Sequence, residues 1–207
     1  IFRDIQILSY SGGKLHIPYV NTNKGVELIR EAKKRNLDIT ASTSLAHVTF
    51  SDKDIANFNT NLKIIPPLRS EIDSKSIKEA LVDGTIDYLT SMHEPIDIDN
   101  KKVVFDLATP GSIGLESVFG IMCNNFTLEK TIDILTRNKS IFEIEDHPIK
   151  IGSHADLTLF NPDKSYEFTE EHILSTSKNC AFISTKMKGI VYGSINNNNS
   201  TLNKLWI

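Results

Sequence analysis

Cysteine, tryptophan and long apolar runs are all scarce in this chain. Its 207 residues include two cysteines and one tryptophan, and no apolar run approaches the roughly 20 residues needed to cross a bilayer. Because Cys123 and Cys180 lie far apart and neither belongs to a metal-type pair, we expect reduced thiols and a cytoplasmic protein. A formal charge of −3 gives no reason to expect a nucleic acid or a membrane as partner.

Familiar catalytic motifs are missing as well. The six histidines form neither a His-x-His pair nor a helical His-Glu-x-x-His motif, and no glycine-rich phosphate loop or Gly-x-Ser-x-Gly elbow occurs. Composition and spacing by themselves therefore indicate a soluble α/β domain and no particular reaction. The chain opens at Ile1, in what reads as the end of a helix. We expect it to be a piece of a longer protein.

Short β-type runs alternate with amphipathic helical stretches over the first two-thirds of the chain. This rhythm predicts parallel βαβ units, and hence an α/β sheet or barrel. Asn36, the pair Asp83-Gly84 and Thr127 read as helix ends, and Ser74 or Ser76 reads as an N-cap. The expected strands cover 14–20, 38–43 and 86–90, and the expected helices cover 24–35, 74–82, 114–122 and 127–136.

The rhythm changes after about residue 148. Residues 155–160 alternate in polarity and meet a turn at 161–163, and residues 188–192 read as a second short strand. The asparagine run 196–199 predicts an exposed loop. We therefore expect two parts, one over 1–147 and a small β subdomain segment over 148–207 that contains the asparagine-rich loop.

Four segments of the chain follow one another in a characteristic order and spacing. They are Leu15-His16-Ile17-Pro18-Tyr19-Val20, Pro66-Pro67-Leu68-Arg69, Asp83-Gly84-Thr85-Ile86-Asp87 and Ser91-Met92-His93-Glu94-Pro95. This series resembles the second half of a dihydroorotase, a metal-dependent cyclic amidohydrolase of pyrimidine synthesis. The resemblance covers roughly residues 1–193. It implies the C-terminal half of a TIM-type (β/α)₈ hydrolase barrel, followed by part of a small β subdomain.

The resemblance also locates a former active site. Tyr19 stands where the family has a metal-binding histidine, and Met92 stands where it has an aspartate that binds metal and acts as general base. Ile65 replaces an asparagine that contacts the substrate ring, and Ile96 replaces a histidine that helps to hold the substrate carboxylate. His47 aligns with a histidine of the family's Pro-His-His segment. The family's own His-x-His pair would lie upstream of this chain.

These replacements remove side chains that could bind metal, act as a base or form hydrogen bonds. A thioether has no basicity and is a weak zinc ligand, and isoleucine can neither donate nor accept a hydrogen bond. We therefore expect no catalytic, cofactor-binding or metal-binding residue in this chain, and zinc only if upstream ligands exist. His16 is expected to be packed or hydrogen-bonded, facing away from Tyr19 in a strand. The resulting vestigial pocket comprises Tyr19, His47, Ile65, Met92, His93 and Ile96.

Two functions of different classes fit this pattern. The first is a dihydroorotase-like protein of pyrimidine biosynthesis that is catalytically inactive, a pseudoenzyme with a structural or regulatory role. The second is an active cyclic amidohydrolase whose metal site is completed by an N-terminal half, with His93 or Glu94 as a substitute base. A third reading is a folded relic without a partner.

The expected partners follow from the expected fold. A half barrel has two open sheet edges, which favour pairing with another segment. The candidates are the missing N-terminal half of the same protein or a second copy of this chain, the latter as a homodimer. The resemblance adds aspartate transcarbamoylase, because some bacteria pair an inactive dihydroorotase-like subunit with that enzyme.

Overall fold

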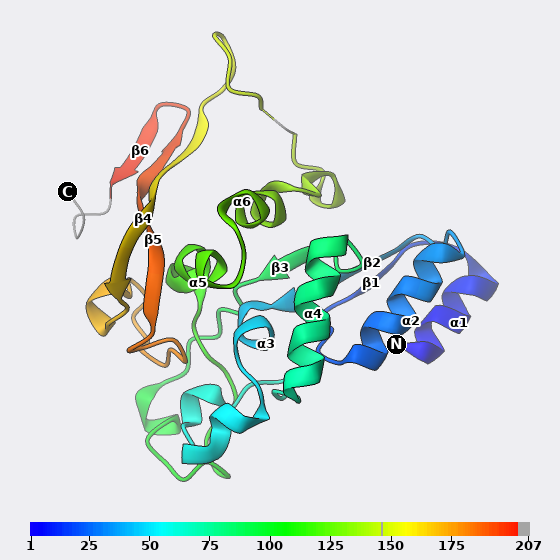
Figure 1. Ribbon diagram of the computed structural model, residues 1–207, viewed down its shortest axis with the longest axis horizontal. Coiled ribbons are helices and arrows are strands. Elements are labelled where there is room, and N and C mark those ends of the chain that lie inside the picture. Colours follow the sequence, from blue (N-terminus) through cyan, green and yellow to red (C-terminus); the bar gives the residue numbers. More distant parts are fainter. Residues whose placement is uncertain (146, 203–207) are drawn as a thin grey trace.

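The computed structural model describes residues 1–145 and 147–202, which form two small sheets with helices beside them (Figure 1). The strands are β1 Leu15–Ile17, β2 Ile39–Ser44, β3 Tyr88–Thr90, β4 Asp156–Glu167, β5 Lys186–Asn196 and β6 Asn199–Leu202. The α-helices are α1 Phe2–Ser11, α2 Asn23–Lys34, α3 Leu45–Thr49, α4 Glu71–Asp83, α5 Val118–Asn125 and α6 Leu128–Thr136. Short 3₁₀ helices cover Asp52–Asn57, Thr60–Leu62, Ile98–Asn100, Leu115–Ser117, Lys139–Phe142 and Glu170–His172.

The first sheet is parallel, in the order β1-β2-β3. Leu15 pairs with Ile39, and Ser42 pairs with Tyr88. Helix α2 connects β1 to β2, and α3 and α4 lie between β2 and β3 in the chain. The expected βαβ rhythm is therefore present. Within residues 1–145 and 147–202 no further strand pairs with the outer edge of β1 or of β3, and the barrel is not closed.

Helices α2 and α4 pack side by side next to this sheet (Figure 1). Their facing sides are apolar: Val26 and Ile29 of α2 and Ile77 and Leu81 of α4 are all 1% exposed or less. Burial of such side chains stabilises the fold by roughly 1.5–3 kcal/mol each. The helical spacing of apolar residues in the sequence thus corresponds to a real core.

Helix α4 begins one turn earlier than the sequence suggested. Ser70 and Asp73 form a reciprocal capping box, in which the Ser70 hydroxyl accepts from the Asp73 amide at 3.3 Å and the Asp73 carboxylate accepts from the Ser70 amide at 3.2 Å. The same carboxylate accepts from the Asn23 amide at 2.8 Å. The expected serine caps further along the chain are wrong, because this box already satisfies the helix start and ties it to α2.

The other expected helix ends are confirmed. Asn36 has a left-handed backbone, with φ 57°, just after α2. Gly84 ends α4 with φ 81°, a conformation that glycine adopts without steric cost. The Thr127 side chain accepts from the Lys130 amide at the start of α6.

The second sheet is antiparallel, in the order β4-β5-β6. Strand β4 continues past the expected turn at 161–163, with a shift of register between Asn161 and Ser165. The asparagine run 196–199 is exposed as expected, but only its two central residues form a turn, and the outer two belong to strands. Asn196 ends β5 and Asn199 begins β6, and the two residues pair across a tight hairpin. The left-handed backbone of Asn197 (φ 51°) allows this turn without a glycine.

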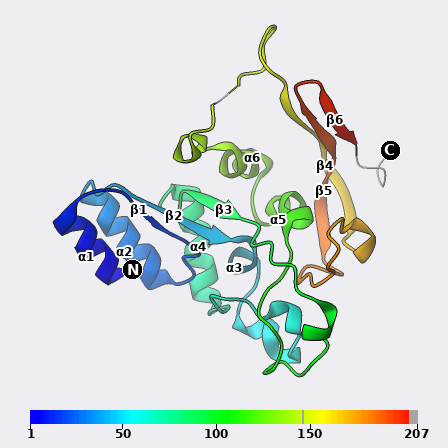
Figure 2. The same cartoon turned by 180° about the vertical axis from the view of Figure 1, so that it is seen from behind.

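Helix α5 lies against β5 (Figures 1 and 2). Two glycines allow the close approach. A Cβ atom on Gly120 would lie 2.8 Å from the Met187 sulfur, and one on Gly189 would lie 2.9 Å from the Phe119 ring. Real Cβ atoms do not tolerate such distances. The second sheet is therefore fixed to the helical part of the chain by backbone-close packing.

Candidate functional site

The loops that follow β1, β2 and β3 carry the residues of interest. Tyr19 lies two residues beyond the end of β1, and Met92 lies two residues beyond the end of β3. His47 lies in α3, which begins directly after β2. Because the three strands are parallel, these loops leave the sheet at the same end. That end carries the active site in barrel enzymes.

Tyr19 and Met92 share an unusual backbone conformation. Their φ angles are 51° and 52°, in the left-handed region, which costs a residue other than glycine roughly 1 kcal/mol. Met92 is 4% exposed, and Tyr19 packs against the same hydrophobic core. The expectation that strand alternation orients Tyr19 is wrong, because β1 ends at Ile17 and the turn sets the direction. Both positions keep a strained turn; the Met92 side chain is buried, and the partly buried Tyr19 ring packs against the core.

His16 links all three strands of the first sheet. Its Nδ1 lies 2.9 Å from the Thr40 hydroxyl, and its Nε2 lies 3.1 Å from the Ser42 hydroxyl and 2.9 Å from that of Tyr88. The imidazole also stacks on the Tyr88 ring, with centroids 5.2 Å apart. Burial lowers the pKa of His16. The hydrogen-bonded role expected for His16 is confirmed.

His47 braces the loop after β2. Its side chain is 2% exposed, and its Nε2 lies 2.9 Å from the Pro66 carbonyl oxygen. Because a carbonyl oxygen can only accept, Nε2 donates and Nδ1 accepts from the Ser44 hydroxyl at 2.8 Å. Burial lowers the pKa of His47 and favours this neutral form. Neither ring nitrogen is free to bind a metal ion.

His93 is held in a similar way. Its Nδ1 accepts from the Leu115 amide at 3.2 Å, so a neutral imidazole carries its proton on Nε2. Glu116 lies nearby, with Oε2 3.9 Å from Nδ1. The other carboxylate oxygen, Oε1, accepts from the amides of Leu174 and Ser175 at 3.1 and 2.9 Å. The His93–Glu116 pair therefore joins the loop after β3 to the C-terminal part of the chain.

Asn179 is a functional-site neighbour that sequence reasoning missed. It is 2% exposed, and its Oδ1 accepts from the Ile96 amide at 3.1 Å. Its Nδ2 donates to the carbonyl oxygens of Glu94 and Gly111 at 3.0 and 3.2 Å. These partners lie 68–85 positions away in the sequence. No local pattern around Asn179 could have revealed them.

The six positions of the vestigial pocket thus have different surroundings. Met92 belongs to the core and the partly buried Tyr19 packs against it. His47 and His93 are hydrogen-bonded through ring nitrogens, and the Ile96 amide is bound by Asn179. Ile65, in contrast, is 64% exposed. Within the described ranges, no three His, Cys, Asp or Glu side chains are placed to hold a metal ion. The donors present do not fit zinc.

Comparisons with known proteins supply the family. No protein-family model matches the chain. The dihydroorotase of Endomicrobium trichonymphae is 40% identical over 197 residues, and that of Caldanaerobacter subterraneus is 36% identical over 196 residues. Both matches cover 91% of this chain, but only 47% and 45% of the relatives. The chain therefore spans slightly under half the length of these relatives.

Solved structures supply the fold. L-hydantoinase from Arthrobacter aurescens superposes with a TM-score of 0.86 at 21% identity, over 98% of this chain and 48% of that one. The inactive dihydroorotase-like domain of the Chaetomium thermophilum CAD-like multifunctional protein superposes with a TM-score of 0.64 at 17% identity, over 95% of this chain and 53% of that one. These neighbours are amidohydrolase barrels matched over about half their length, which confirms the expected half barrel.

The described residues contain no helix that is both long and apolar enough to span a membrane. Motif order, sequence identity and superposition agree with one another along nearly the whole chain. The chain belongs to the dihydroorotase family of the metal-dependent amidohydrolase superfamily and corresponds to its C-terminal portion.

Proposed function

We propose that this chain is the C-terminal half of a catalytically silent dihydroorotase-like protein, with a structural or regulatory role in pyrimidine biosynthesis. The observation that carries the proposal is Met92. It occupies the position of the family's metal-binding general base, yet its thioether is 4% exposed and belongs to the hydrophobic core. A buried thioether cannot accept the proton that an attacking water must lose.

The nearby histidines support the same conclusion. Both ring nitrogens of His47 are hydrogen-bonded within the protein, to Ser44 and to Pro66. The alternative, an active amidohydrolase with His93 as a substitute base, requires a free lone pair on the imidazole. In neutral His93 the only lone pair accepts from the Leu115 amide, and Nε2 carries a proton. This arrangement disfavours His93 as a base.

An assay of the full-length protein tests the proposal. We expect no hydrolysis of dihydroorotate, and no cyclisation of carbamoyl aspartate, above the rate without enzyme when zinc is supplied. Elemental analysis of the purified protein should find less than one equivalent of zinc. The dihydroorotase of Endomicrobium trichonymphae serves as the positive control. Zinc-dependent turnover would overturn the proposal, and its loss in His93→Gln would support the active alternative with His93 as the base.

We also propose that a second half barrel completes this one. The outer edges of β1 and β3 have no strand beside them within the described ranges, and unpaired edges favour strand addition. The relatives are about twice as long as the matched region, so an N-terminal half of the same protein is the favoured partner. The purified chain mixed with that half should elute as a 1:1 complex in size-exclusion chromatography. Elution of this chain as a homodimer that does not bind the N-terminal half would contradict the proposed completion of the barrel.

A further inference from the structure

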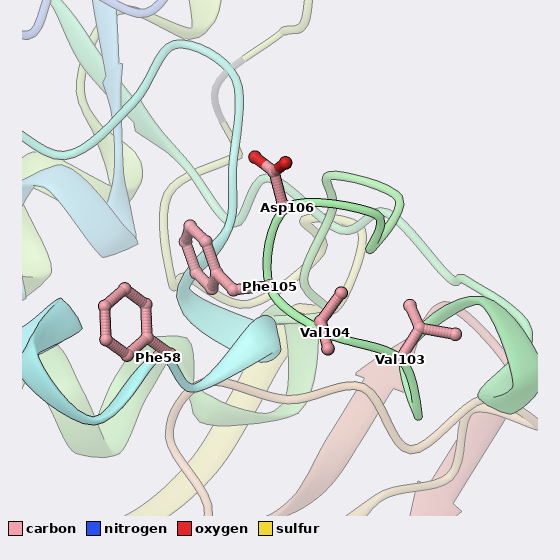
Figure 3. Close-up of a pocket in the computed structure, with 5 residues that line it drawn as sticks. All are labelled: Phe58, Val103, Val104, Phe105 and Asp106. Atoms are coloured by element: carbon pink, nitrogen blue, oxygen red, sulfur yellow. The ribbon is translucent and has the colours of Figure 1, made fainter.

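An apolar cleft between two loops has partners within the chain (Figure 3). It is lined by Phe58, Val103, Val104, Phe105 and Asp106. The Lys63 ammonium lies 5.5 Å from the centre of the Phe105 ring and donates to the main-chain oxygens of Phe105 and Asp106 at 2.9 and 2.8 Å. Lys101, which is 4% exposed, donates to the main-chain oxygens of Thr60 and Thr109 at 2.8 and 2.9 Å. These lysines brace the cleft from inside the protein.

The two faces of the first sheet have different chemistry. Ile17, Ile39 and Ala41 lie in the hydrophobic core together with Val26 and Ile29 of α2. Because side chains alternate between the two faces of a sheet, the residues between these positions lie on the opposite face. Each of them carries a hydroxyl group or an imidazole. The residues of this polar face are His16, Thr40, Ser42, Ser44, Tyr88 and Thr90.

A polar face of this kind is unusual for the inside of a barrel. The inward-facing side chains of (β/α)₈ barrels are mainly branched and apolar, and they fill the interior in layers. Here the His16 imidazole is hydrogen-bonded to the hydroxyls of Thr40, Ser42 and Tyr88. His16, Thr40 and Tyr88 nevertheless remain partly exposed. The chain thus presents a preformed polar layer that is still open to water.

The number of strands indicates which partner fits this face. The first sheet has three strands, and a second copy of the chain would add three more. That total falls short of the strands in a (β/α)₈ barrel. The matched relatives are about twice as long as this chain, and their unmatched N-terminal half is long enough to supply the remaining strands. An N-terminal half therefore fits the face better than a second copy does.

The surroundings of His16 favour an uncharged imidazole. Burial lowers the pKa of His16, and the field of the Asp87 carboxylate opposes this effect. Within the described ranges, Asp87 is the charged residue whose field acts on His16, and its carboxylate is paired with the Lys33 ammonium at 2.8 Å. The Tyr88 hydroxyl is the other titratable group in contact with the ring. Covering the polar face would remove the remaining water and disfavour the imidazolium further.

We propose that the N-terminal half of the barrel closes over this polar face and that the closed form requires an uncharged His16, so that acid separates the two halves. The proposal rests on the completion of the barrel proposed above, and it does not depend on whether the protein is catalytic. Closure lowers the pKa of His16 below its value in the open half. Association therefore releases a proton, and the affinity declines as pH falls through the pKa of the open half.

Isothermal titration calorimetry of this chain with the N-terminal half tests the proposal. We expect the association constant to fall at least about threefold between about pH 7.5 and about pH 5. Titrations in two buffers of different ionisation enthalpy should show that binding releases protons to the buffer. The NMR signals of the His16 imidazole should titrate at lower pH in the complex than in the chain alone. Circular dichroism at each pH excludes unfolding of either half as the cause.

Two variants assign the effect to His16. His16→Gln keeps a hydrogen-bond donor and acceptor but does not titrate, so it should bind at neutral pH and lose most of the pH dependence. His154→Gln is the matched control, because His154 is exposed and lies 2.7 Å from the Asn197 side chain, at the hairpin of the second sheet. This control should retain the full pH dependence.

The possible failures can be told apart. An association constant that is equal or larger at acid pH would overturn the proposal and leave the completed barrel intact. The same holds for a pH dependence that persists unchanged in His16→Gln. The absence of a complex at every pH would overturn the completion of the barrel, and this proposal with it.

Discussion

Buried polar side chains define this protein at the scale of single residues. His47 and Asn179 are both 2% exposed, and each connects segments that are distant in the sequence. A buried polar group costs free energy unless its hydrogen bonds are satisfied. Both residues satisfy theirs entirely within the protein, and both therefore stabilise the loops around the former active site.

The neutral state of His47 makes stability depend on pH. Burial lowers its pKa in the folded chain, whereas the unfolded chain keeps an ordinary value near 6.5. As pH falls below about 6.5, the unfolded state binds a proton that the folded state does not, so stability is present above that pH and declines below it. Urea unfolding between pH 7.5 and pH 5 (about two and a half units) should show a decreasing free energy. His47→Gln should flatten the decline, and an unchanged slope would contradict the assignment.

Substitution of Asn179 should strongly destabilise the folded chain. Asn179→Ala removes the partner of the Ile96 amide and of two carbonyl oxygens, and we expect a loss of about 2–4 kcal/mol in the free energy of unfolding. Urea unfolding at neutral pH measures it. Asn198→Ala, at an exposed hairpin position, is the matched control and should change stability by less than about 0.5 kcal/mol. Equal effects at the two positions would refute the role of Asn179.

At the scale of secondary-structure elements, close packing and loop bracing add to the contacts within the sheets. Helix α5 approaches β5 through Gly120 and Gly189, and the loop around Phe105 is held by lysines. Each device needs one residue type, because a Cβ atom or a shorter side chain would break the contact. Substitutions at these points should have effects well beyond the size of the change.

Gly189 offers a test with an internal control. Gly189→Ala adds a Cβ atom 2.9 Å from the Phe119 ring at a backbone φ of 89°. Gly152 has a similar φ of 88° with nothing within 4 Å. We expect Gly152→Ala to cost about 1 kcal/mol from conformation alone and Gly189→Ala to cost about 1–3 kcal/mol more from overpacking. Thermal unfolding of both variants measures the difference. Equal losses of stability in the two variants would show that α5 moves to make room for the added Cβ atom.

Lys101 makes the stability of its loop depend on alkaline pH. Burial lowers its pKa from 10.5 to about 8. Between these values the unfolded chain holds a proton that the folded chain has released, so the free energy of unfolding should rise with pH across this window. Hydrogen exchange of the loop amides, corrected for the intrinsic rate, should report the rise. Lys101→Met should remove the dependence, whereas Lys102→Met, an exposed neighbour, should preserve it.

At the scale of the whole molecule, the chain is half of a barrel with a second, antiparallel sheet fixed to it. The parallel sheet has few strands and open edges, so its helices and buried polar residues supply much of its cohesion. We expect complex formation with the N-terminal half to raise the midpoint of thermal unfolding by several degrees, because a partner that binds the folded state stabilises it. Differential scanning fluorimetry of the mixture measures this, and an unchanged midpoint would oppose completion of the barrel.

The sequence by itself determined the family, the βαβ rhythm and most helix ends. Those features depend on residues close together in the chain: apolar spacing along a helix, Gly84 at a helix end, and the motifs around Tyr19 and Met92. It left open where α4 begins, how the asparagine run folds and where β1 ends before Tyr19. The start of α4 is set by the local Ser70–Asp73 capping box, whose Ser-x-x-Asp spacing was present in the sequence, whereas the pairing of β6 with β5 and the end of β1 at Ile17 were seen only in the structure.

The same division applies to the candidate site. The replacement of ligand-type residues by Tyr19 and Met92 was visible in the sequence, since side-chain chemistry is local. The burial of Met92, the occupied ring nitrogens of His47 and His93, and the bracing by Asn179 were decided only by the tertiary structure. Apart from Ser44, which is three positions from His47, their partners lie 19 to 85 positions away. Such distant contacts are fixed by the packing of the whole chain.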